Sequence, residues 1–296
     1  MDQLHLMRVY VAVAEEEGFA AASRRLSMSP PAVTRAIAAL EESLGVKLLN
    51  RTTRYVRATE AGLRYLDDAK RIVQDVEIAN EAAVGINAEP KGHLSVTAPV
   101  LFGQQHVLPG VVEYLKRYPQ TNVNAVFLDR TVNLLEEGFD VGIRIGELAD
   151  SSMRARKVGE VKLVLVASSE YLLEQGIPLF PSDLSEHTII NSGSNNFSHD
   201  WHFEQGNQKS LHRIKPRLTV TTNQAAINAA KLGLGITRVV SYQVADELSN
   251  GELAVVLEDH QLAPLPIHII HREGRYSSAK VRCFIDLMAE QLNRTF

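Results

Sequence analysis

The chain has 296 residues, with 31 basic and 35 acidic side chains, a net charge of −4 and a hydrophobic fraction of 45%. This length allows two or three domains with sizeable cores, and the composition is ordinary for a globular protein. The single cysteine, Cys283, excludes an internal disulfide and a cysteine-clustered metal site. Apolar runs stay well below the roughly 18 residues of a membrane span and the first residues lack a signal-peptide pattern, so we expect a cytoplasmic protein that makes no membrane contact.

The first 26 residues predict two short helices. Apolar side chains recur at helical spacing from Leu6 to Ala14, which indicates one buried face. Gly18 is expected to end this helix, and a second helix begins at Phe19. Small side chains at 20–23 let two helices cross closely, as a helix-turn-helix requires.

A third helix is expected to begin at Ser29 and to end at Gly45. Ser29 is a plausible N-cap, and proline at the first helical position loses nothing by lacking an N–H. At about 100° per residue, one face carries apolar side chains and the opposite face carries small and polar ones. In helix-turn-helix docking, the first residues of this helix reach base edges in the major groove. The residues expected to contact DNA here are Ser29, Pro30, Pro31, Ala32, Thr34 and Arg35.

Arg35 is either a base reader, through a bidentate pair to guanine, or a phosphate anchor, and the sequence leaves both roles open. After this helix, residues 46–49 and 55–58 alternate like two short strands of a wing. Arg51, Thr52 and Arg54, between those strands, are expected on phosphates or in the minor groove.

Positive charge gathers in this segment of an otherwise acidic chain. Residues 24–57 hold seven basic and two acidic side chains, a balance of +5. Such a concentration is typical of a nucleic-acid site. The alternative is a small helical domain with a solvated basic face, but the order of turn, cap and wing favours duplex DNA as the partner.

The segment resembles the N-terminal domain of LysR-type transcriptional regulators. The resemblance is carried by Phe19 to Leu26, Ser29 to Leu44, Gly45 to Leu49, Arg51 and Thr59-Glu60-Ala61-Gly62, and more weakly by Asp140 to Gly146, Leu163 to Ser168, Tyr171-Leu172, Pro181 to Leu184 and Gly233 to Ile236. It implies a winged helix-turn-helix, a linker helix and a two-lobed α/β effector domain similar to periplasmic binding proteins. Two departures are Leu49, where the family often has Phe, and Arg238, which adds a charge near the region where effectors usually bind.

Residues 59–88 predict a single long helix that joins the two parts. Tyr65, Ala69, Ile72, Val76, Ala79, Ala83 and Ile86 alternate at spacings of four and three, which is a heptad seam. A helix of about thirty residues spans roughly 45 Å. We expect this seam to pair two copies of the chain, although packing on the chain's own core is the alternative. The domains are therefore predicted as 1–58, 59–88 and 89–296.

From residue 89 onward, strands alternate with helices, which predicts α/β sheets. Strands are expected over 93–98, 122–128, 140–145, 163–167, 188–191, 217–221, 235–239 and 267–271, and helices over 104–117, 132–137, 224–231, 242–248 and 279–292. Two similar sets suggest two lobes. The resemblance implies that the chain crosses between them near 161–163 and 265–267. Lobe I is then 89–162 with 267–296, and lobe II is 163–266.

Ligands of such sheets bind beyond the carboxyl ends of strands, near helix N-termini. Hydroxyls, backbone N–H groups and an arginine at those ends favour a small anion, with an aromatic wall. The residues expected to bind it are Pro99, Val100, Phe102, Gly103, Arg144, Ser192, Trp201, Thr222 and Asn223. For each of them, turn chemistry or core packing is the alternative; Arg144, for example, could pair with Asp140.

The other residue patterns in the chain do not predict a metal site, a cofactor site or a catalytic site. His199/His202 lie in a polar loop and His268/His271 point to opposite faces of a strand, so no metal is expected. Gly233-Leu234-Gly235 lacks the context of a dinucleotide fingerprint, and no catalytic constellation is visible, so neither a cofactor nor enzyme activity is expected.

The sequence therefore predicts a regulator of transcription that binds promoter or operator DNA as a homodimer or homotetramer. RNA polymerase and a small anionic effector are the other expected partners. Two alternatives remain: a C-terminal part that only assembles subunits, and an enzyme fused to a DNA tether.

Overall fold

The computed structural model describes residues 2–51, 56–84, 89–148, 153–193, 199–206, 208–272 and 278–296. The chain divides into two compact units. The N-terminal unit is 1–88 with 275–279, and the C-terminal unit is 89–274 with 280–296.

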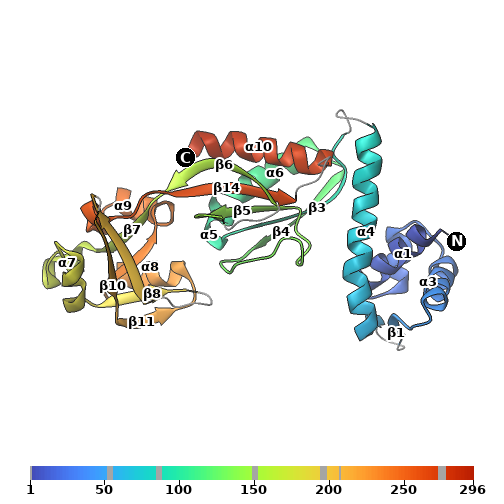
Figure 1. The fold of residues 1–296 in the computed structure, drawn as a ribbon, viewed down its shortest axis with the longest axis horizontal. Helices are drawn as coiled ribbons and strands as arrows, with labels where there is room; N and C mark the ends of the chain where they lie inside the picture. Colours follow the sequence, from blue (N-terminus) through green and yellow to red (C-terminus); the bar gives the residue numbers. More distant parts are fainter. Residues whose placement is uncertain are drawn as a thin grey trace. The chain divides into compact units, whose positions relative to one another are not determined.

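Helices dominate the N-terminal unit, whose two strands form a small sheet (Figure 1). Its elements are α1 (Gln3–Glu15), α2 (Phe19–Arg25), α3 (Pro30–Leu44), β1 (Leu49–Arg51), β2 (Val56–Ala58) and α4 (Glu60–Val84). Helix α3 follows the extended residue Ser29 and ends at Gly45, whose φ of 67° is a left-handed conformation that glycine tolerates. Ser29 occupies the cap position, but its side chain makes no capping hydrogen bond.

The core of the N-terminal unit lies where α1, α2 and α3 meet. Val9, Tyr10 and Ile37 are fully buried there. The Tyr10 hydroxyl donates a hydrogen bond of 2.7 Å to the carbonyl oxygen of Gly62, and burial raises the pKa of Tyr10 to about 12. Because Gly62 lies in the first turn of α4, this bond fixes the start of the long helix to α1.

Two positions of the predicted α4 seam pack inside the same chain. Ala69 is fully buried, and Tyr65 is half-buried with its ring centroid 5.7 Å from that of Tyr10. The expectation that these two positions pair with a second chain is wrong, because α1 covers them. Further along the seam, Ile72 is 39% exposed and Ala79 is exposed.

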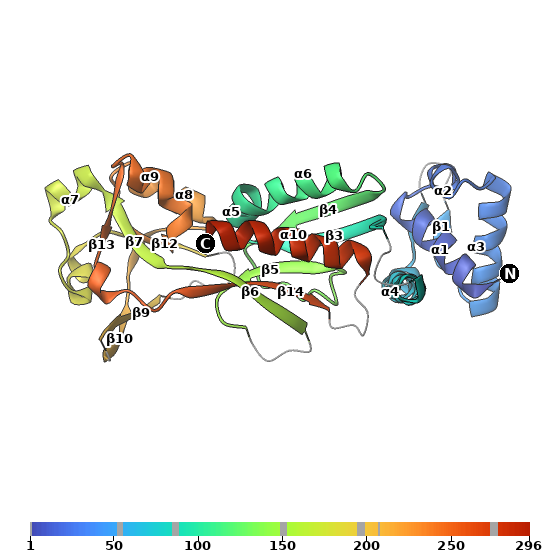
Figure 2. The ribbon, with the colours of Figure 1, turned by 90° about the horizontal axis from the view of Figure 1, so that it is seen from above.

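Lobe I of the C-terminal unit is a five-stranded sheet with the order β4-β3-β5-β14-β6. Its elements are β3 (Gly92–Ala98), α5 (Val100–Phe102), the π-helical turn Gly103–Val107, α6 (Leu108–Arg117), β4 (Thr121–Phe127), β5 (Val141–Ile145), β6 (Met153–Val161), β14 (Leu265–Arg272) and α10 (Ala279–Thr295). Strands β3, β4 and β5 are parallel, and β14 runs antiparallel to β5 and β6. Helices α6 and α10 pack on this sheet (Figure 2), burying Tyr114 and Phe284.

Lobe II is a second five-stranded sheet, with the order β11-β8-β12-β7-β13. Its elements are β7 (Leu163–Ser168), α7 (Ser169–Gln175), a 3₁₀ turn (Pro181–Glu186), β8 (Ile189–Ser192), β9 (Asp200–Gln205), β10 (Gln208–Arg213), β11 (Pro216–Val220), α8 (Asn223–Lys231), β12 (Ile236–Val240), a 3₁₀ turn (Ser241–Val244), α9 (Ala245–Ser249), β13 (Leu253–Val256) and a 3₁₀ turn (Glu258–His260). Helix α8 packs Ile227 on one face of the sheet, and the β9–β10 hairpin packs Trp201 and Phe203 into a second core that includes Leu165.

Several elements differ from those expected. Residues 132–137 do not form the predicted helix: Leu134–Gly138 make turns, because Asn133 Oδ1 accepts the N–H of Leu135 at 3.1 Å and Gly138 has a φ of 72°. Sequence reasoning also omitted strands β6, β9, β10 and β13 and helix α7.

Candidate nucleic-acid interface and ligand pocket

The outward face of α3 carries the residues expected at the DNA. Pro31, Thr34 and Arg35 are exposed, as is Ala38 one turn later, whereas Ala32 is half-buried. The Thr34 hydroxyl donates a hydrogen bond of 3.0 Å to the Pro30 carbonyl oxygen, which turns it back onto the helix. Within the described part of the chain, Arg35 has no ion pair and remains available to an outside acceptor.

One arginine counted in the basic segment is already neutralised. Arg25 lies 2.8 Å from a Glu15 carboxylate oxygen and 3.3 Å from one of Glu16. Lys70 of α4 contacts the same Glu15 carboxylate at 3.0 Å, and the hydrogen bonds from Lys70 and Arg25 lower the pKa of Glu15 against the opposing effect of its burial. This cluster holds α1, α2 and α4 together, so the positive charge left for DNA lies on α3, on Arg24 and on the wing.

The wing is anchored by an acidic residue of α3. Glu41 Oε1 accepts hydrogen bonds from the backbone N–H groups of Leu48 at 2.9 Å and Leu49 at 3.0 Å. Thr59 closes the other side, donating its hydroxyl to the Lys47 carbonyl oxygen at 2.8 Å. Leu49 then pairs with Ala58 in the two-stranded sheet.

This anchoring holds the backbone of Arg51 at the end of β1, opposite Val56. The other two wing candidates, Thr52 and Arg54, lie outside the described residues.

We expect Glu41→Ala to destabilise the N-terminal unit by about 1–3 kcal/mol, because two backbone N–H groups lose their acceptor. Glu41→Gln keeps an acceptor oxygen and should cost much less. Glu42→Ala, on the exposed neighbour, is the matched control. Urea unfolding followed by circular dichroism measures the effect. Equal stabilities for Glu41→Ala and Glu42→Ala would contradict the anchoring role.

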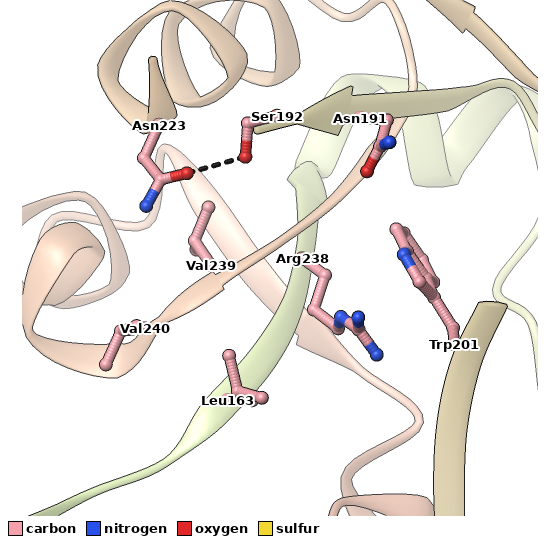
Figure 3. Close-up of a pocket in the computed structure, with 8 residues that line it drawn as sticks. All are labelled: Leu163, Asn191, Ser192, Trp201, Asn223, Arg238, Val239 and Val240. Atoms are coloured by element: carbon pink, nitrogen blue, oxygen red, sulfur yellow. Dashed lines mark hydrogen bonds between the residues drawn. The ribbon is translucent and has the colours of Figure 1, made fainter. Parts of the chain in front are cut away.

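A cavity of about 220 Å³ opens in lobe II (Figure 3). Its lining is Leu163, Asn191, Ser192, Trp201, Asn223, Arg238, Val239 and Val240. Three of the expected ligand residues, Ser192, Trp201 and Asn223, are brought together here. The Arg238 guanidinium carbon lies 4.8 Å from the centroid of the Trp201 ring. Burial lowers the pKa of Arg238 to about 10, so the side chain remains charged at neutral pH.

A series of hydrogen-bonded hydroxyl and amide side chains borders the cavity and continues to the C-terminal end of β12. Ser192 Oγ donates to Asn223 Oδ1 at 2.5 Å, and Asn223 Nδ2 donates to Gln243 Oε1 at 3.1 Å. The same Gln243 oxygen accepts the backbone N–H of Val240 at 3.1 Å. Thr222 does not line the cavity; its Oγ1 caps α8 by accepting the N–H of Ala225 at 3.2 Å.

The expected ligand residues of lobe I lie elsewhere. Phe102 is fully buried in the lobe I core, and a Cβ on Gly103 would lie 2.3 Å from the Phe127 ring, so this glycine serves close packing. Pro99 precedes α5, and the Val100 N–H donates to Asp129 Oδ1 at 2.9 Å.

The fifth lobe I candidate, Arg144, donates to the carbonyl oxygen of its neighbour Ile143 at 3.0 Å, and burial lowers its pKa. Asp140, the alternative partner considered for Arg144, accepts the Ser95 N–H with its carboxylate at 2.8 Å. None of the five lobe I candidates lines the lobe II cavity.

Aromatic rings connect the two lobes. Tyr242, which follows β12, lies edge-on to Phe102 with ring centroids 5.3 Å apart. His106 and Phe296 complete the cluster, at 5.0 and 5.6 Å from Phe102. Burial raises the pKa of Tyr242 to about 12 and lowers that of His106. We call these four residues the interlobe cluster.

Arg238 and Asn191 are the polar cavity residues that the expected ligand set lacked, and Leu163, Val239 and Val240 are the apolar ones. One feature of the sequence could have identified Arg238 as a ligand residue. It is a charged residue within an otherwise apolar strand, at a position where this chain departs from the pattern of the family that it resembles. Among the described residues, no group of three His, Cys, Asp or Glu side chains is arranged to hold a metal. The helices of this described part of the chain are too short or too polar to span a bilayer.

Comparison with known proteins gives two matches to families. Residues 4–63 match "Bacterial regulatory helix-turn-helix protein, lysR family", and residues 87–293 match "LysR substrate binding domain". The HTH-type transcriptional activator AaeR of Escherichia coli (strain K12) is 33% identical over 294 residues, 98% of this chain and 94% of that protein. An HTH-type transcriptional repressor of Pseudomonas aeruginosa is 32% identical over 292 residues, 98% of this chain and 92% of that protein.

Solved structures give the same likeness. The LysR-type transcriptional regulator CrgA from Neisseria meningitidis matches with a TM-score of 0.62 and 29% identity, covering 97% of this chain and 98% of that chain. The full-length Vibrio cholerae virulence activator AphB matches with a TM-score of 0.63 and 27% identity, covering 98% of this chain and 99% of that chain.

Proposed function

The chain belongs to the LysR-type transcriptional regulators, with a DNA-binding helix-turn-helix and an effector-binding domain, and we propose which of its residues bind DNA, pair two chains and bind the effector. The family expected from the sequence is confirmed.

Helix α3 enters the major groove of duplex DNA. The observation that carries this proposal is the exposed face of Pro31, Thr34 and Arg35, where Arg35 has no ion pair within the described residues. Arg35 donates to a guanine edge or a phosphate, and the small side chains contact thymine methyl groups. Arg51, Thr52 and Arg54 bind the adjacent backbone or minor groove.

Two copies pair through the exposed part of α4. Ile72 is 39% exposed and lies on the predicted seam with Val76 and Ala79. Pairing about a two-fold axis presents two α3 helices to half-sites of a pseudo-palindromic operator, and two such dimers form a tetramer.

We expect Ile72→Glu to shift the purified chain from dimer to monomer, because it puts a charge into an apolar seam. Leu63→Glu is the matched control: Leu63 is 57% exposed, and nine residues at about 100° each put it on the opposite face of α4. Light scattering coupled to size exclusion measures the mass. If both variants remain dimeric, α4 is not the pairing surface.

A small anion is the effector, and RNA polymerase is the partner that the bound dimer recruits or excludes in the cytoplasm. The cavity of lobe II, with its charged Arg238, supports an effector rather than a domain that only assembles subunits. The effector acts through a difference in affinity between two conformations of the paired chains.

Footprinting on the DNA upstream of the chain's own gene tests the proposal. We expect two protected half-sites separated by about one helical turn, or a multiple of it. Protection that slides along the fragment without a preferred position would overturn sequence-specific reading.

A further inference from the structure

Arg238 brings a positive charge into the lobe II cavity without an anion to balance it. It stands in the middle of β12, opposite Leu165 of β7, and Figure 3 shows its guanidinium directed toward Trp201. Among the residues that the structure describes, no carboxylate pairs with it. A partly buried cation of this kind is stabilised by an acceptor from outside the chain.

Trp201 leaves the hydrogen-bonding edge of Arg238 available. The guanidinium carbon of Arg238 lies 4.8 Å from the centroid of the Trp201 ring, which is a cation–π contact and not a hydrogen bond. The N–H donors of a guanidinium lie in its plane and point outward from its edge. A carboxylate can accept two parallel hydrogen bonds from such an edge.

Asn191 lines the same cavity. It is 6% exposed, and Figure 3 shows its side-chain oxygen, rather than its Nδ2, on the side of Arg238. The neighbouring pair Ser192 and Asn223 bond to each other at 2.5 Å, which occupies the Asn223 carbonyl oxygen. Arg238 is thus a charged donor that the cavity offers to a ligand, and it fits a group that accepts hydrogen bonds.

The remaining lining limits the size and polarity of the ligand. Leu163, Val239 and Val240 are apolar. A cavity of about 220 Å³ is smaller than the range of pockets that hold drug-sized molecules. The ligand is accordingly a small molecule with one anionic end and a short apolar part.

We propose that the effector is a small organic monocarboxylate, bound within lobe II with its carboxylate on Arg238, its apolar part against Leu163, and Trp201 as one wall. This inference rests on the proposed function, since it identifies the class of effector and the residues that select it. It replaces Arg144 with Arg238 as the cation that recognises the anion.

Trp201 is the single tryptophan of the chain, so its fluorescence reports on this cavity directly. The full-length protein is titrated with sodium benzoate, phenylacetate and isobutyrate, and with benzamide and inorganic phosphate for comparison. We expect a saturable change of emission with at least one of the three carboxylates, and a much weaker response to benzamide and phosphate. Calorimetric titration provides a second measure of affinity that does not depend on the tryptophan.

Variants test the residues. Arg238→Gln is expected to weaken carboxylate binding at least about tenfold, since a charge-assisted pair is lost. Arg238→Lys keeps the charge but not the two-pronged donor, so its affinity for the carboxylate should lie between that of the unchanged protein and that of Arg238→Gln. Asn191→Asp should weaken binding, because it puts a second negative charge beside the anion. Arg217→Gln, on the exposed β11 arginine, is the matched control. Circular dichroism checks that each variant is folded.

Three results would overturn the inference: no saturable response to any of the three carboxylates, equal affinity for benzamide or phosphate, or unchanged binding in folded Arg238→Gln. The two proposals fail separately. A chain that protects its operator but ignores the carboxylates contradicts only this inference, whereas one that binds benzoate but no duplex contradicts only the proposed function.

Discussion

Gly62→Ala is expected to destabilise the N-terminal unit by about 3 kcal/mol and to abolish binding to duplex DNA. A Cβ at this position would lie 2.1 Å from the Leu48 carbonyl oxygen and 2.9 Å from the Tyr10 hydroxyl. The first of these atoms belongs to the backbone at the base of the wing, so it cannot rotate away. The start of α4 must then move, which also breaks the bond from Tyr10 to the Gly62 carbonyl oxygen.

Urea unfolding and duplex binding of the same preparation measure this prediction. Gly18→Ala is the control, because its Cβ would meet only the Glu16 carbonyl oxygen, at an ordinary 3.5 Å. We expect this control to cost less than about 1 kcal/mol, the loss of a glycine cap. If Gly62→Ala is as stable as Gly18→Ala, the contact between α4 and the wing is not tight.

Phe102→Ala is expected to lower the free energy of unfolding of the C-terminal unit by about 3–5 kcal/mol, the usual cost of emptying a buried aromatic site. Phe102 is fully buried in lobe I, and it contacts three other rings of the interlobe cluster. Leu108→Ala, nearby and 44% exposed, should cost far less.

This prediction separates a core role for Phe102 from the ligand-wall role expected from the sequence. Calorimetry of unfolding gives the stability, and the response of Trp201 to benzoate gives the ligand affinity. A core residue changes the first and leaves the second intact in the folded protein. A stable Phe102→Ala variant with weakened carboxylate binding would restore the ligand-wall interpretation.

The elements that were predicted correctly from the sequence are those whose structure follows from a single local pattern. Apolar spacing and Gly45 defined α3, and the alternation of strands and helices indicated the α/β units. Sequence reasoning failed at α4, where Tyr65 and Ala69 satisfy both a heptad seam and a face packed on α1. Over two turns the periods of 3.5 and 3.6 residues differ too little to separate these interpretations.

Only some of the residues that line the lobe II cavity could be predicted from the sequence, because others are brought together by tertiary packing. Ser192 is the last residue of β8 and Asn223 is the first residue of α8, and both line the cavity. The ends of strands and helices are places where ligands of α/β sheets often bind. Arg238 stands inside a strand, and its facing partner Trp201 comes from the β9–β10 hairpin, which the sequence analysis omitted. Their contact depends on tertiary packing between distant segments, which no local pattern encodes.

The paired N-terminal units are expected to bind duplex DNA in a sequence-specific way. This is measured as the affinity for the upstream DNA fragment and for a scrambled duplex at several salt concentrations. We predict at least about a hundredfold loss of affinity between 50 and 200 mM salt, and a preference of at least about a thousandfold for the upstream fragment. Affinity that does not depend on salt, or that is equal for the two duplexes, would contradict sequence-specific binding.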